Sequence, residues 1–182
     1  ADSQECYDYF KYAPQLSETL DMPVIVRLTT RISHARGFVA LGDQVENFEK
    51  DYEKQPAKYI MMPGYARGRK VDLLKRIEAA KKLSDSTELN RIEAGDGKVG
   101  VICSGVCYQY VKEALPHASI LKLGMVYPLP EQKIRDFAAS VEKLYVVEEL
   151  EPYIQRYVES LGIECIGDQV FGKAGELSAN LV

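Results

Sequence analysis

The sequence predicts a three-layer α/β/α fold, in which helices cover both faces of a mostly parallel sheet of five strands. Short apolar runs alternate with amphipathic helical segments from residue 98 onward, and proline or glycine stands at most of the boundaries. Such alternation is typical of β-α-β units. The runs are continuously apolar, as parallel strands are when helices bury both of their faces. Three consecutive crossovers of this kind predict the sheet.

The predicted elements are short and clearly bounded. The five strands cover residues 58–62, 98–105, 118–124, 143–149 and 163–167. Three helices join the last four strands, at residues 106–115, 130–140 and 152–162. Pro116 ends the first of these helices, and a proline opens each of the other two. Residues 70–93 carry a longer helical pattern, which predicts one helix or two helices with a cap at Ser84–Ser86.

The chain before residue 58 reads as a separate piece. Apolar residues recur every three or four positions over residues 3–20 and predict a helix, with Pro14 marking a kink or a break. Residues 24–30 form an apolar, β-branched run that predicts a buried strand. Residues 40–57 are acidic and only loosely periodic, so they predict a linker between two structural units.

Composition excludes several classes of protein. The net charge of −4 lacks the basic excess with which nucleic-acid-binding proteins neutralise phosphates. No apolar run approaches the ~20 residues of a membrane span, and the sequence shows no signal-peptide pattern. The cysteines, at positions 6, 103, 107 and 165, lack the spacing of a metal site. We therefore expect reduced thiols, no bound metal, a cytoplasmic location, and neither nucleic acid nor membrane as a partner.

Two groups of basic residues flank the predicted linker. They are Arg27, Arg31, His34 and Arg36 before it, and Arg67 and Arg69 after it. If the two groups meet, they form a clamp for a phosphate ligand or a surface for an acidic partner. The other interpretation is a solvated face at a domain boundary, and the sequence leaves both open. Arg27 favours a site, because an arginine within a buried strand needs a partner.

Two carboxylates, Glu148 and Glu149, lie at the carboxyl end of a predicted strand. Open α/β sheets bind their ligands at this end. Paired carboxylates carry out acid–base catalysis when an apolar environment raises one pKa. They also stabilise the N-terminus of a following helix, where negative charge is favourable. Capping or an interface role is the favoured interpretation, and catalysis remains the alternative.

Three stretches of the chain resemble one family of enzymes. They are DMPVIVRLTTRISHARG (21–37), GVICSGVCYQYVKEALPHASILKLGMVYPLPEQKIRDFAASVEKLYVVEELEPYI (100–154) and GELSANLV (175–182). These stretches resemble the α subunits of the indolepyruvate:ferredoxin oxidoreductases, which are thiamin-dependent 2-oxoacid:ferredoxin oxidoreductases. The resemblance covers nearly the whole chain, and the long stretch is its most specific part.

The resemblance implies a fragment from the middle of that subunit. Residues 1–37 would be the last helix and strand of a pyrimidine-binding domain, and residues 38–57 a linker. Residues 58–182 would form a domain like the C-terminal domain of transketolase, with a five-stranded sheet and one antiparallel edge strand. Arg31, His34 and Arg36 would then lie at a domain boundary near the active site of the whole enzyme.

The resemblance also implies a reaction, its cofactors and its partners. The family oxidatively decarboxylates aryl pyruvates such as indolepyruvate to arylacetyl-CoA, with thiamin diphosphate, magnesium and 4Fe–4S clusters as cofactors and coenzyme A as a substrate. Its partners are a β subunit and ferredoxin, and a fragment with exposed edges invites a homodimer or a domain swap.

The fragment itself is expected to bind none of these cofactors and to be inactive alone. Gly95-Asp96-Gly97 precedes a predicted strand, whereas the thiamin motif of the family follows one, and no ferredoxin-type cysteine run is present. We therefore expect a structural and interface-forming role. The alternative is a free-standing module like the transketolase C-terminal domain that binds a partner protein or a CoA-type phosphate ligand.

Overall fold

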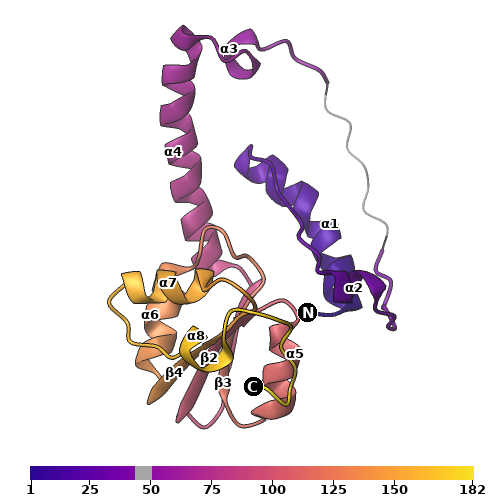
Figure 1. Ribbon diagram of the computed structural model, residues 1–182. Coiled ribbons are helices and arrows are strands. Elements are labelled where there is room, and N and C mark those ends of the chain that lie inside the picture. Colours follow the sequence, from indigo (N-terminus) through magenta and orange to yellow (C-terminus); the bar gives the residue numbers. More distant parts are fainter. Residues whose placement is uncertain (44–50) are drawn as a thin grey trace. The chain divides into compact units, whose positions relative to one another are not determined.

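The chain divides into two compact units. The computed structural model describes residues 1–43 and 51–182 (Figure 1). Residues 81–182 form one unit together with Ala1 and Asp2, and residues 3–80 form the other. No helix in the described ranges is long and apolar enough to cross a membrane.

The unit of residues 81–182 contains a mixed sheet of four strands in the order β1-β3-β2-β4. The strands are β1 (Asn90–Glu93), β2 (Val99–Ser104), β3 (Ser119–Leu123) and β4 (Lys143–Val147). Strand β2 pairs in parallel with both β3 and β4, whereas β1 runs antiparallel to β3 at one edge. The predicted α/β class and the antiparallel edge strand are therefore present.

Two predicted strands differ from the structure. Residues 58–62 form no strand, because Pro56 opens the short helix α3 (Pro56–Tyr59) and Pro63 opens α4 (Pro63–Ser86), leaving three residues between them. Residues 163–167 contribute a single parallel bridge between Ile166 and Tyr145 rather than a full strand. The prediction of five strands is therefore not confirmed.

Strand β1 lies where the sequence predicted the end of a long helix. The buried Asn90 explains the change. Its amide nitrogen donates to the Ser84 carbonyl at 3.0 Å, and its amide oxygen accepts from the backbone N–H groups of Gly124 and Met125 at 3.0 and 2.9 Å. These bonds end α4 and hold the start of β1 beside the end of β3. A few apolar residues cannot distinguish a helix end from a strand by periodicity alone.

Helices cover both faces of the sheet (Figure 1). Helices α6 (Glu131–Ala139) and α7 (Tyr153–Ser160) pack on one face, around Ile102, Leu121, Phe137 and Val158. Helix α5 (Cys107–Ala114) packs on the other face, and its core is formed by Val101, Cys103, Cys107, Tyr108, Val111, Ile120, Val147 and Leu177. A short helix, α8 (Asp168–Phe171), follows. Each fully buried aliphatic or aromatic side chain stabilises this unit by roughly 1.5–3 kcal/mol.

The unit of residues 3–80 is built from helices and extended chain. Helix α1 (Ser3–Leu20) continues through Pro14, and α2 (Thr30–His34) begins where the Thr29 hydroxyl accepts the Ile32 N–H at 3.4 Å. The predicted buried strand at 24–30 is absent, and Ile25 is 89% exposed. In the described part of this unit only Leu16 and Ala80 are buried. Residues 44–50 of the predicted linker lie outside the described residues.

Candidate functional site

The basic residues predicted as a site are distributed over the unit of residues 3–80. Arg27, Arg31, His34 and Arg36 are all exposed, on the extended segment and on and after α2. Arg67 is exposed on α4, whereas Arg69, two residues later, is half-buried. Because residues 24–30 form no buried strand, the argument that Arg27 needs a buried partner does not hold. Among the six predicted residues, Arg69 enters a cluster of charged groups.

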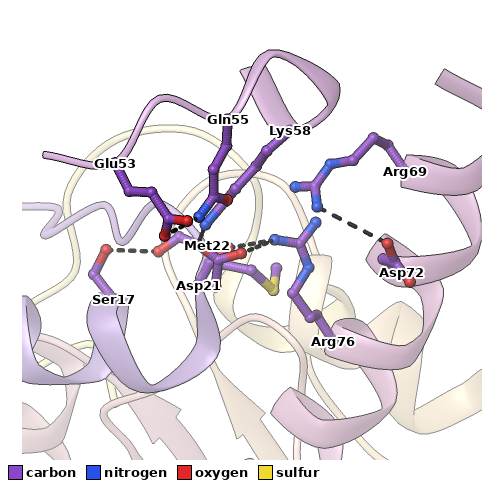
Figure 2. A network of polar contacts seen from close by, with 9 residues as sticks. All are labelled: Ser17, Asp21, Met22, Glu53, Gln55, Lys58, Arg69, Asp72 and Arg76. Carbon is purple, nitrogen blue, oxygen red and sulfur yellow. Dashed lines mark hydrogen bonds and ion pairs between the residues drawn. The ribbon is translucent and has the colours of Figure 1, made fainter. Parts of the chain in front are cut away.

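That cluster surrounds Asp21, directly after α1, and consists of Asp21, Lys58, Arg69 and Arg76 (Figure 2). The Lys58 Nζ donates to Oδ1 of Asp21 at 2.6 Å. The Arg76 guanidinium donates to Oδ2 at 2.8 Å and to the Asp21 carbonyl at 2.6 Å. We call these four residues the Asp21 cluster.

Local structure places each member. Asp21 has a φ of 49°, in the left-handed region that aspartate tolerates at the end of a helix. The Ser17 hydroxyl fixes this turn by donating to the Met22 carbonyl at 2.7 Å. Arg69 and Arg76 are seven positions apart on α4, which is close to two helical turns and puts both on one face.

Positive charge exceeds negative charge in the cluster. The hydrogen bond from Lys58 holds the pKa of Asp21 below its ordinary value, and the same bond raises the pKa of Lys58. Arg69 lies 3.9 Å from the Asp72 carboxylate, which is too long for a hydrogen bond, and Asp72 also lies 3.8 Å from Lys75. The Nε atoms of Arg69 and Arg76 are buried and have no hydrogen-bond acceptor among residues 1–43 and 51–182.

Sequence reasoning named Arg69 and missed the other three members. Asp21, Lys58 and Arg76 are distant along the chain, and no local pattern connects them. A signal in the sequence was the seven-residue spacing between Arg69, directly before the predicted helix at 70–93, and Arg76 within it.

The two predicted strand-end carboxylates bind backbone groups. Glu148 accepts the N–H of Ile154 through Oε2 and the N–H of Gln155 through Oε1, each at 2.9 Å. It therefore caps the N-terminus of α7. Burial nevertheless raises the pKa of Glu148 above its ordinary value. Glu149 accepts the N–H of Leu177 at 2.9 Å and so ties the C-terminal segment to the end of β4.

A second charged group, missed by sequence reasoning, lies between β1, β3 and α5. Glu93 accepts from the Tyr108 hydroxyl at 2.7 Å and from the Lys112 Nζ at 2.8 Å. Lys122 on β3 is 1% exposed, with its Nζ 5.6 Å from the centre of the Tyr108 ring. Burial lowers the pKa of Lys122 to about 8, and Asp2 opposes this shift. The sequence predicted a strand at residues 118–124, but it did not indicate that Lys122 is buried there.

The cysteines do not converge on one site. Cys103 and Cys107 lie in the core beneath α5, and Cys165 lies in the core on the opposite face of the sheet. Burial raises the pKa of Cys107 to about 12 and that of Cys165 to about 11, which disfavours the thiolate that binds iron or zinc. In the described ranges no group of three or more potential ligands could hold a metal ion. These thiols do not fit an iron–sulfur cluster.

Gly95, Asp96 and Gly97 form the loop between β1 and β2. Asp96 accepts the Lys98 N–H at 3.0 Å, and its own N–H donates to the His117 carbonyl at 3.0 Å. The loop enters a strand at its amino end. It also follows β1, so the sequence-based expectation that no strand precedes these residues is wrong. Residues 120–130 contain no asparagine to complete the diphosphate and magnesium motif, so the loop does not fit thiamin diphosphate.

Known proteins match the chain over nearly its whole length. The indolepyruvate oxidoreductase subunit IorA of Archaeoglobus fulgidus is 38% identical over 176 residues, covering 93% of this chain and 28% of that protein. The IorA subunit of Methanothermobacter thermautotrophicus is 34% identical over 165 residues, covering 87% and 27%. The subunit of Pyrococcus horikoshii is 35% identical over 193 residues, covering 96% and 30%. The chain belongs to the IorA family.

The match to IorA confirms the resemblance found in the sequence. The chain spans less than a third of the length of these IorA subunits. No family model matches it. Among solved structures, a 2-oxoglutarate:ferredoxin oxidoreductase from Magnetococcus marinus, with 2-oxoglutarate, coenzyme A and succinyl-CoA bound, aligns with 59% of this chain and 20% of its own. Its sequence identity is 18% and its TM-score is 0.47.

Proposed function

We propose that the chain is a structural and interface-forming segment of an IorA-type subunit. The complete enzyme would oxidatively decarboxylate aryl pyruvates such as indolepyruvate to arylacetyl-CoA and pass the electrons to ferredoxin. The observation that carries the proposal is the match of 93% of this chain to 28% of an indolepyruvate oxidoreductase subunit. Thiamin diphosphate, magnesium and 4Fe–4S clusters would be bound by other parts of that enzyme.

The chemistry of the described residues supports a non-catalytic role. The carboxylates that were candidates for acid–base catalysis hold backbone N–H groups, at Ile154 and Gln155 for Glu148 and at Leu177 for Glu149. The buried thiols have raised pKa values and are poor nucleophiles for that reason.

We assign the parts of the chain by the same proposal. Residues 1–37 would be the end of a pyrimidine-binding domain, residues 38–57 a linker, and residues 58–182 a domain like the C-terminal domain of transketolase. The exposure of Phe10, Ile25 and Leu28, at 55%, 89% and 43%, supports the first assignment. Apolar side chains so exposed mark surfaces that other parts of a protein cover.

The partners follow from the same assignment. We propose that the exposed apolar residues of the 3–80 unit contact the rest of the IorA-type subunit, and that a β subunit and ferredoxin complete the enzyme. The isolated chain would instead cover these residues by self-association, as a homodimer or a domain swap. Light scattering over a range of protein concentrations measures this directly.

A segment exchange tests the proposed function. In the Archaeoglobus fulgidus IorA subunit, this chain replaces the segment that it matches, and indolepyruvate-dependent reduction of ferredoxin is measured in the assembled complex. We expect the exchanged subunit to assemble and to be active, and the isolated chain to form no arylacetyl-CoA. A subunit with the segment deleted is the control and should lose assembly. Arylacetyl-CoA formation by the isolated chain would overturn the non-catalytic assignment.

A further inference from the structure

We propose that the Asp21 cluster binds a phosphate group, either free or as part of a larger phosphorylated ligand. This inference concerns Asp21, Lys58, Arg69 and Arg76, and it does not depend on the activity of the complete enzyme. Three observations support it: the excess of positive charge, two buried donors without acceptors, and the geometry of the two arginines on α4.

The charge balance leaves room for an anion. Lys58, Arg69 and Arg76 lie around one carboxylate, that of Asp21, and all three favour its ionised form. Figure 2 shows two further carboxylates beside the cluster. Asp72 is 51% exposed and approaches Arg69 only to 3.9 Å, and Glu53 accepts from the Gln55 amide at 2.7 Å. Like charges gathered at one place are unfavourable unless counter-charge compensates them. An anion with two negative charges would compensate the positive charge of the cluster that Asp21 and Asp72 leave uncompensated.

The unmade hydrogen bonds point to where the anion would lie. Buried polar groups in folded proteins are nearly always hydrogen-bonded, and an orphan donor indicates a missing water, ion or ligand. The Nε groups of both Arg69 and Arg76 are buried without an acceptor. Figure 2 shows both side chains directing their guanidinium groups toward the Asp21 turn. Each of these guanidinium groups therefore has one donor that the described residues leave unused.

The donor set favours phosphate in particular. Arginine presents a planar fork of N–H groups that matches two phosphate oxygens, and its charge persists at all physiological pH values. Arg69 and Arg76 stand two turns apart on the same helix, so their spacing is fixed before any ligand arrives. The Lys58 ammonium adds a third donor from α3. A tetrahedral anion has enough oxygens to accept from Lys58, Arg69 and Arg76 together. The Asp21 carboxylate accepts only from Lys58 and Arg76.

Asp21 holds the site in place and also limits its affinity. Its carboxylate and carbonyl fix the Arg76 guanidinium at 2.8 and 2.6 Å, and its carboxylate fixes Lys58 at 2.6 Å. The same negative charge repels a second anion. Removing only this charge should therefore strengthen phosphate binding, provided that the carbonyl still positions Arg76.

Calorimetry with inorganic pyrophosphate on the whole 182-residue chain tests the proposal. We expect Arg69→Gln and Arg76→Gln each to weaken binding by roughly 10- to 100-fold, the loss of one charge-assisted hydrogen-bonded partner. Arg67→Gln is the matched control, because Arg67 is an exposed arginine on the same helix, and it should change binding by less than about twofold. Arg69→Lys keeps the charge without the fork and should restore part of the affinity.

Two further arms separate the alternatives. If coenzyme A binds more tightly than pyrophosphate and loses at least as much affinity in Arg69→Gln, the ligand is a larger phosphorylated molecule. Equal affinities of coenzyme A and pyrophosphate would identify the free anion. Asp21→Asn should bind pyrophosphate more tightly. The proposal would be overturned if pyrophosphate did not bind at about 10 mM, or if Arg67→Gln lost as much affinity as Arg69→Gln. It would also be overturned if a glutamate-rich peptide bound equally strongly, because the cluster would then be assigned to a carboxylate of a protein partner.

Discussion

The two units of the chain place similar side chains in opposite environments. Phe137 in the unit of residues 81–182 is 1% exposed, whereas Phe38 in the unit of residues 3–80 is 105% exposed. The first unit has a core on each face of its sheet, and the described part of the second buries only Leu16 and Ala80. The unit of residues 81–182 therefore has its own hydrophobic driving force for folding. The unit of residues 3–80 exposes apolar surface of the kind that other parts of a protein cover.

Substitution of these two phenylalanines gives the largest expected contrast. Phe137→Ala should lower the free energy of unfolding by about 3–5 kcal/mol, because it removes a buried ring and leaves a cavity. Phe38→Ala should change it by less than about 0.5 kcal/mol at protein concentrations at which the chain is monomeric. Guanidinium unfolding followed by circular dichroism measures both. A comparable loss in the two variants would show that Phe38 is buried in solution, by self-association or otherwise.

The buried Lys122 should make the stability of the unit of residues 81–182 depend on pH. Its folded pKa, about 8, lies below the unfolded value of 10.5, so the unfolded chain binds more protons between these values and stability rises with pH across the window. The gain should be on the order of 3 kcal/mol. In Lys122→Met this rise in stability should disappear. The difference between the two proteins separates the contribution of Lys122 from the titration of cysteines and tyrosines. Urea unfolding between about pH 7 and pH 10.5 provides the measurement. A parallel pH dependence in both proteins would exclude this role of Lys122.

The cap of α7 should give a smaller effect. Glu148→Gln keeps one acceptor oxygen for the two N–H groups of Ile154 and Gln155, and it should cost about 1 kcal/mol. Glu151→Gln is the matched control, since Glu151 only forms an exposed ion pair with Arg156 at 3.3 Å, and should cost less than about 0.5 kcal/mol. Both values come from denaturant midpoints at constant slope. A larger loss in Glu151→Gln would contradict the capping assignment.

The smallest stability effect is expected in the unit without a core. Asp21→Asn should cost no more than about 1 kcal/mol near pH 7, because its ion pairs are largely solvated. The Lys58 hydrogen bond lowers the folded pKa of Asp21 below 3.8, so this contribution is present above 3.8 and is lost as the pH falls through the folded value. The stabilities of wild type and variant should therefore converge as the pH falls below the folded pKa of Asp21. A difference that persists there would assign the effect to something other than this charge.

Sequence reasoning succeeded where local pattern decides structure. Continuous apolar runs predicted β2, β3 and β4, and prolines marked the starts of the predicted helices around α6 and α7. The residues that resembled the oxidoreductase family are matched by IorA subunits over most of the chain. These features depend on neighbouring residues, and neighbouring residues are what a sequence displays.

The features that sequence reasoning missed depend on distant residues. Strand β1 exists because Asn90 binds backbone groups of residues 34 and 35 positions away. The Asp21 cluster joins Asp21 to Lys58 across 37 positions and to Arg76 across 55 positions. The predicted strand at 58–62 was lost to two prolines that open helices on either side of it. In the first two cases long-range contacts decided the structure, and in the third two helix starts outweighed local β-propensity.

Three of the four cysteines are buried, so the reactivity of their thiols depends on local opening of the structure. Cys103 and Cys107 lie under α5, Cys165 lies in the core under α6 and α7, and Cys6 lies on α1 in the other unit. A thiol-specific alkylating reagent modifies a buried cysteine only when the surrounding structure opens transiently. The rates of labelling at Cys103, Cys107 and Cys165 would therefore report on the opening of each face of the sheet, with the half-buried Cys6 as an accessible reference and no probe added to the chain.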